Sequence, residues 1–160
     1  MNSRDQLTQD QLSRIVVVKQ VAAQDVLDTF PDRYQILSND VAKDSWQLLD
    51  TFDQELKNAG QILLRRHNQI ILVQPDTGIF LQDKCPKRWS FVSELKTGAV
   101  SQYLQGVDPL RACLPLVDLD VSWQHHRFLD DQQKTICRLD WLTLKLKNQQ
   151  VSIIHLKGVR

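Results

Sequence analysis

Glycine is scarce in this chain of 160 residues, which has five of them, about 3% against an average near 7%. The glycines are too scattered to form G-x-G-x-x-G, G-x-x-x-x-G-K-[ST] or G-x-S-x-G. We therefore expect no dinucleotide fold of the Gly-rich type, no Walker-type nucleotide site and no nucleophile elbow. The five are Gly60, Gly78, Gly98, Gly106 and Gly158.

Cysteine is also rare. Cys85, Cys113 and Cys137 lie more than twenty residues apart, which excludes a C-x-x-C metal knuckle or redox pair. Sparse and odd-numbered thiols are typical of a reducing compartment, so we expect free, buried cysteines and a cytoplasmic protein.

Long apolar runs and an excess of either charge are missing as well. No run approaches the ~20 residues of a membrane span, and residues 1–11 are polar rather than basic and then apolar like a signal peptide. Twenty Lys and Arg against nineteen Asp and Glu give a net charge of +1. This balance gives no sign of a membrane partner or of a specific nucleic-acid partner.

Hydrophobic residues make up 42% of the chain, enough for a globular core, and their periodicity is mostly that of strands. We predict an α+β protein, mostly antiparallel β with a few short helices, whose sheet curls or closes because closure removes exposed edges. Turns are expected at His67-Asn68 and at 130–133. The predicted strands are 14–21, 46–51, 61–66, 69–74, 79–81, 88–92, 116–129 (as one strand or two), 134–139, 141–146 and 151–156, and the predicted helices are 24–30, 53–59, 99–104 and 110–114.

Residues 48–66 read Leu-Leu-Asp-Thr-Phe-Asp-Gln-Glu-Leu-Lys-Asn-Ala-Gly-Gln-Ile-Leu-Leu-Arg-Arg. A strand ending in Asp-Thr, a short helix with a final Gly and a strand bearing arginines follow one another here. This order resembles a segment of the CYTH superfamily, which includes class IV adenylyl cyclases, thiamine triphosphatases and inorganic triphosphatases. The resemblance implies one CYTH-like domain over 1–160, folded as an eight-stranded tunnel-like barrel. The final Leu-Lys-Gly-Val (156–159) is similar to the end of domains that a helical CHAD domain follows, so we expect a further C-terminal domain.

The opening strand departs from the family pattern, which is Glu-x-Glu-x-Lys with the glutamates holding a divalent metal and the lysine facing the phosphates. Here Lys19 takes the place of the lysine, but Ile15 and Val17 stand where the two carboxylates belong. Aliphatic side chains cannot coordinate Mg²⁺ or Mn²⁺, so we expect no metal, no cofactor and no catalytic residue.

The resulting expectation is a degenerate CYTH-like domain that binds polyphosphate or nucleotide phosphates without hydrolysing them. The expected phosphate ligands are cations on predicted strands, and Arg offers bidentate hydrogen bonds. These residues are Lys19, Arg66, Arg138 and Lys145. Such residues are also common on the solvent face of a strand, where they need no ligand.

Two alternatives remain open. The chain is an active triphosphatase dependent on Mg²⁺ or Mn²⁺ if Asp118, Asp120 or Glu94 replaces the missing carboxylates. It is a structural or protein-interaction module if its own side chains, including the four tryptophans, fill the barrel.

Overall fold

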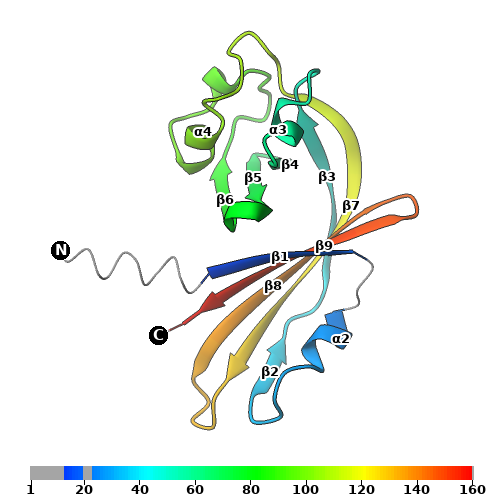
Figure 1. The fold of residues 1–160 in the computed structure, drawn as a ribbon, viewed down its shortest axis with the longest axis vertical. Coiled ribbons are helices and arrows are strands. Elements are labelled where there is room, and N and C mark those ends of the chain that lie inside the picture. Colours follow the sequence, from blue (N-terminus) through cyan, green and yellow to red (C-terminus); the bar gives the residue numbers. More distant parts are fainter. Residues whose placement is uncertain (1–12, 20–22, 160) are drawn as a thin grey trace, which may run out of the picture. The chain divides into compact units, whose positions relative to one another are not determined.

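The computed structural model describes residues 13–19 and 23–159 (Figure 1). These residues form mostly antiparallel strands with a few short helices, which confirms the predicted α+β class. They group into two compact units. Unit 1 is formed by two segments of the chain, the residues up to Asp44 and those from Asp120 onward, and unit 2 is the continuous segment Ser45–Leu119 between them. The unit boundaries fall inside strands β3 (Ala42–Asp50) and β7 (Leu114–Leu129), so these two strands contribute to both units.

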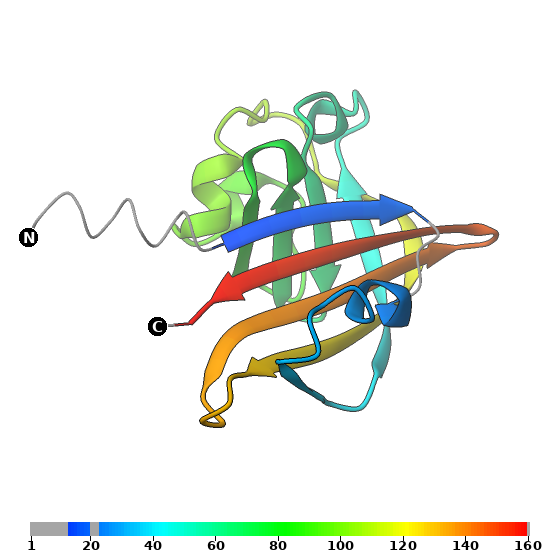
Figure 2. The same cartoon turned by 60° about the horizontal axis from the view of Figure 1, so that its bottom comes forward.

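Unit 1 is a curved antiparallel sheet with one short helix, α2 (Ala23–Leu27), against it (Figure 2). Its strands lie in the order β1-β9-β8-β7, and β2 also pairs with β7. The end of the predicted strand 14–21 lies outside the described residues. The bounds are β1 (Ser13–Lys19), β2 (Gln35–Ser38), β8 (Thr135–Leu146) and β9 (Gln149–Gly158).

One face of the unit 1 sheet forms a core with α2. Leu139 and Trp141 are two residues apart on β8, so both project to this face, where Leu27 of α2 packs with them. Phe128 and Ile154 from the neighbouring strands complete the cluster. The helical spacing of Val26, Leu27 and Phe30 in the sequence is thus explained by burial against the sheet.

Unit 2 pairs its strands in the order β3-β4-β5-β6 and packs short helices against them. The predicted turn at His67-Asn68 is present, with His67 in the left-handed region at φ 50°. The core includes Leu49, Leu56, Leu63, Leu72, Val100 and Leu104. The bounds are α3 (Glu55–Asn58), β4 (Ile62–Arg66), β5 (Gln69–Gln74), η1 (Pro75–Thr77), β6 (Ile79–Lys84), η2 (Val92–Glu94) and α4 (Ala99–Tyr103).

Helix α4 begins against a carboxylate from β6. Asp83 Oδ2 accepts the Val100 N–H at 2.7 Å, and the Gly98 N–H donates to Ser101 Oγ at 2.8 Å. A Cβ added to Gly98 would lie 2.7 Å from the same Asp83 Oδ2. At φ −169° Gly98 has an extended backbone that any residue adopts, so the constraint at this position is the close approach of Asp83.

Gly98→Ala should therefore lower the free energy of unfolding by about 1–2 kcal/mol, because the methyl group displaces Asp83 from its hydrogen bond at the helix start. Urea titration followed by far-UV circular dichroism measures this change. Gly106→Ala is the matched control, since a Cβ at Gly106 meets nothing within 4 Å. Equal losses in the two variants would contradict the assigned role of Asp83.

Two predicted elements are wrong. Residues 88–92 are not a strand, because Glu94 Oε2 accepts the N–H groups of Ser90 (2.6 Å) and Phe91 (2.8 Å) and folds the segment into a turn. Residues 110–114 are not a helix. Asp108 Oδ1 accepts the Leu110 N–H at 2.9 Å, and this local bond competes with a helical one.

Other strand bounds differ from the prediction. The two predicted strands 134–139 and 141–146 merge into a single strand, β8 (Thr135–Leu146), because Asp140 pairs on both sides and does not interrupt the ladder. The whole of β2 was missed, as its residues are exposed or half-buried and carry no apolar alternation. The three cysteines are free, with Cys85 and Cys113 buried and Cys137 half-buried.

Candidate functional site

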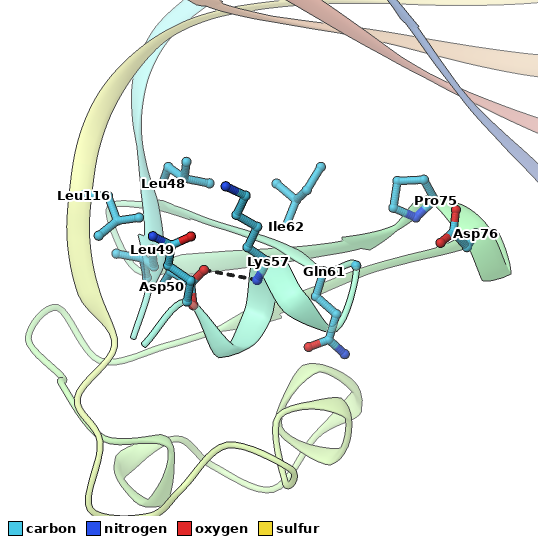
Figure 3. Close-up of a pocket in the computed structure, with 11 residues that line it drawn as sticks. Leu48, Leu49, Asp50, Lys57, Gln61, Ile62, Pro75, Asp76 and Leu116 are labelled. Carbon is cyan, nitrogen blue, oxygen red and sulfur yellow. Dashed lines mark hydrogen bonds between the residues drawn. The ribbon is translucent and has the colours of Figure 1, made fainter. Parts of the chain in front are cut away.

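The Asp-Thr pair that carries the family resemblance has a structural role in unit 2. Asp50 is 4% exposed, and its carboxylate accepts the N–H groups of Thr51 (2.7 Å), Leu56 (3.0 Å) and Lys57 (3.1 Å). Thr51 Oγ1 accepts the Glu55 N–H at 3.1 Å. The two side chains thus hold the first turn of α3, and the dashed line in Figure 3 marks the bond from Lys57.

A partly open cleft of about 600 Å³ lies beside α3 in unit 2 (Figure 3). Its walls are mainly apolar, from Leu48, Leu49, Ile62, Pro75 and Leu116. The cleft falls in the size range of small-molecule sites, which are typically apolar with a few placed polar groups. Here the remaining lining residues are Asp50, Gln54, Lys57, Gly60, Gln61 and Asp76.

A row of three cations crosses the sheet of unit 1 on the face away from α2. Arg127 of β7 is the Cα partner of Arg138 on β8, and Arg138 is the partner of Lys157 on β9. Directly paired residues project to the same face, and neighbouring strands lie about 4.8 Å apart. The three exposed side chains, which we name the basic row, therefore span about 10 Å at their Cα atoms.

A second row lies two residues along each strand from the basic row, on the same face. His125 and His155 flank Asp140 in register, and His125 Nδ1 bonds Asp140 Oδ1 at 2.5 Å. Burial, reinforced by the charge of Lys157 and opposed by that of Asp140, lowers the pKa of His155 to about 4. His155 is thus neutral at pH 7, while the cations of the basic row stay in solvent.

On the α2 face of the same strands, His126 is 1% exposed and shares a 2.7 Å hydrogen bond with Ser38 Oγ. Burial is the main cause that lowers its pKa, with the nearby His125 charge adding to the effect. The adjacent histidines 125 and 126 thus face opposite sides of the sheet, as their alternation predicts.

The four cations predicted as phosphate ligands are dispersed. Arg138 belongs to the basic row, whereas Lys145, an odd number of residues further along β8, projects to the opposite face and pairs with Asp120. Lys19 pairs through its backbone with Val151, and its side chain lies outside the described part of the structure. Arg66 is in unit 2, with its guanidinium 6.0 Å from the centre of the Trp46 ring.

Arg127 and Lys157 were missed by the sequence analysis. Lys157 could have been found from the symmetry of a hairpin. In a hairpin with its turn at 147–148, residues at equal distances from the turn pair with each other, and this rule pairs Lys157 with Arg138. For the hairpin of β7 and β8 the same rule is uncertain by one residue, because a register shift lies between Phe128 and Leu129. The partner of Arg127 therefore cannot be assigned from the sequence. Such a shift moves a side chain to the other face of the sheet.

The carboxylates considered as replacement metal ligands are not gathered. Glu94 is bound to its own turn, as described above, and Asp118 and Asp120 are exposed. In residues 13–19 and 23–159, no group of three or more His, Cys, Asp or Glu side chains is placed to hold a metal ion.

The described part of the chain contains no helix with the length and apolarity needed to cross a bilayer. Comparison with known proteins gives no match for this chain among protein-family models, curated proteins or solved structures.

Proposed function

We propose that this chain is a CYTH-like domain that binds inorganic polyphosphate or the phosphate chain of a nucleotide and does not hydrolyse it. The observation that carries the proposal is the basic row. Three cations from three neighbouring strands share one face of the sheet, in direct register and without a carboxylate among them.

The chemistry of the row suits an extended polyanion. Two of its members are arginines, whose planar guanidinium groups bind phosphate oxygens through paired hydrogen bonds, and the third is a lysine. Each exposed cation alone contributes at most about 1 kcal/mol, so a single phosphate would be held weakly. A chain of several phosphates engages all three at once, which favours polyphosphate over orthophosphate.

We propose binding without hydrolysis for two reasons, one from the residues of the opening strand and one from the residues next to the basic row. Ile15 and Val17 offer no oxygen to a divalent cation at the positions where the family carries glutamates. The one carboxylate in the row next to the cations, Asp140, is hydrogen-bonded to His125. A cytoplasmic location and a CHAD domain following in the full-length protein belong to the same proposal.

Isothermal titration calorimetry with tripolyphosphate, ATP and long-chain polyphosphate tests the proposal. We expect the combined variant Arg127→Gln, Arg138→Gln, Lys157→Gln to lower the affinity at least about tenfold, because three charge-assisted contacts are lost. Raising the salt concentration should weaken binding to the wild type for the same reason.

The matched control is Lys87→Gln, Arg88→Gln, Lys96→Gln, which removes the same charge from exposed residues of unit 2. Equal losses in both triple variants would show a general charge effect and contradict the site. Phosphate release from tripolyphosphate with Mg²⁺ or Mn²⁺ would contradict the lack of hydrolysis. If Asp118→Ala or Asp120→Ala then abolished that release, the triphosphatase alternative would stand.

A further inference from the structure

The cleft of unit 2 differs in character from the basic row of unit 1, because its lining is mainly apolar and includes charged side chains of both signs. In Figure 3 the ammonium group of Lys57 lies between Leu48 and Ile62, and Asp76 lies at one end of the drawn residues, beside Pro75. Both charged side chains are exposed. Neither is among the residues in ion pairs within the described part of the chain.

The third charged group of the cleft, Asp50, is engaged in hydrogen bonds within the fold. Its two carboxylate oxygens accept three backbone N–H groups, so Asp50 serves the fold of α3 and is not free for a ligand. The charged side chains that remain available for direct contact with a ligand are thus Lys57 and Asp76.

Ile62 and Pro75 lie between these two charges in Figure 3, and the apolar lining of the cleft is not fully covered by the protein. Leu116 is 51% exposed although it lines the cleft, and Leu48, Ile62 and Pro75 are only half-buried. Several apolar side chains left partly exposed together in a concave site are typical of a surface that a ligand covers. A ligand that covers it needs an apolar body.

We infer that the cleft binds a small zwitterionic molecule with an aliphatic body, its anionic group facing Lys57 and its ammonium group facing Asp76. The complementary pattern of charge, apolar wall and opposite charge carries this assignment. It is independent of polyphosphate binding, because Asp76 would repel a polyanion and the basic row belongs to unit 1.

The probes are ω-amino carboxylates of increasing length, namely aminobutyrate, aminohexanoate, aminooctanoate and aminodecanoate, titrated into the full chain and followed by amide chemical shifts. We expect one length to bind best, with shifts at Gly60, Gln61 and Ile62. The carboxylate and the alkylamine of the same length, each with a single charge, should bind up to about fivefold more weakly.

Charge exchange in the protein gives the second measurement. Lys57→Glu alone and Asp76→Lys alone should abolish the preference for the zwitterion, and the double variant should restore it because the ligand binds in the reverse orientation. Both positions are exposed, and the amide spectrum checks that each variant is folded.

Three results would overturn the inference. These are no shift with any probe at millimolar concentration, equal affinity for the zwitterion and its singly charged analogues, or shifts located outside the cleft. Shifts at the cleft that appear on raising the protein concentration alone would assign this surface to a second copy of the chain and would equally overturn it.

Discussion

The Asp50→Ala variant is expected to lose about 3–5 kcal/mol of unfolding free energy, the largest effect of any single substitution considered for this protein. A hydrogen bond to a charged acceptor is worth about 1.5–3 kcal/mol, and Asp50 accepts three backbone N–H groups. Alanine leaves the N–H of the buried Leu56 without its acceptor. Urea titration followed by tryptophan fluorescence measures the loss.

Asp53→Ala is the matched control, because Asp53 lies three residues away, is 46% exposed and forms a 3.1 Å ion pair with Arg111. An exposed pair of this kind contributes about 0–1 kcal/mol. Asp50→Asn keeps one acceptor oxygen and should fall between the two alanine variants. A loss in Asp50→Ala no greater than that in Asp53→Ala would contradict the role assigned to the Asp-Thr pair.

The second large effect is a loss of stability in mild acid that depends on His155. Its pKa is about 4 in the folded protein and 6.5 in a free histidine, so the unfolded chain binds the proton more readily. The free energy of unfolding therefore falls as the pH is lowered from 6.5 to 4, by about 3 kcal/mol for this residue. His126, whose pKa is also lowered, shifts stability in the same direction.

Urea titrations at a series of pH values between 7 and 4 measure this dependence. His155→Gln should flatten the curve whatever its effect at pH 7, because the variant has no imidazole to protonate at that position. His67→Gln is the matched substitution at an exposed hairpin corner, against which the slope for His155→Gln is compared. An identical slope for His155→Gln and the wild type would refute the assignment.

The parts of the fold that could be predicted from the sequence are those set by local chemistry. The helix α3 and its final glycine were predicted, and Gly60 does adopt φ 70° as the following Gln61 N–H bonds Leu56 O at 2.9 Å. The turn at His67-Asn68 was also predicted, since two apolar runs flank it closely. The two wrongly predicted elements, 88–92 and 110–114, are segments in which the side chains of Glu94 and Asp108 accept backbone N–H groups. Hydrophobic periodicity does not indicate such hydrogen bonds.

The candidate sites depend on information that the linear pattern does not hold. The basic row requires the register of three strands, and the register shift beside Phe128 leaves the face of Arg127 undecided from the sequence. The cleft gathers residues from β3, α3, the turn at Pro75 and β7, which only the tertiary fold of unit 2 brings together. Of the three residues in the basic row, only Arg138 was among the cations predicted from the sequence, because it lies on a predicted strand.

The pairing of β1 with β9 has a consequence for synthesis of the protein. Ser13 pairs with Lys157, so the first described strand meets its partner only when the residues up to 157 have been translated. At ~5–20 residues per second this wait is on the order of ten seconds, during which the run Ile-Val-Val-Val has an unpaired edge. Unit 2 comes from one continuous stretch and can be complete by then. We therefore expect nascent chains to aggregate through the unpaired edge of β1. The aggregated fraction should increase as translation of the residues between β1 and β9 becomes slower.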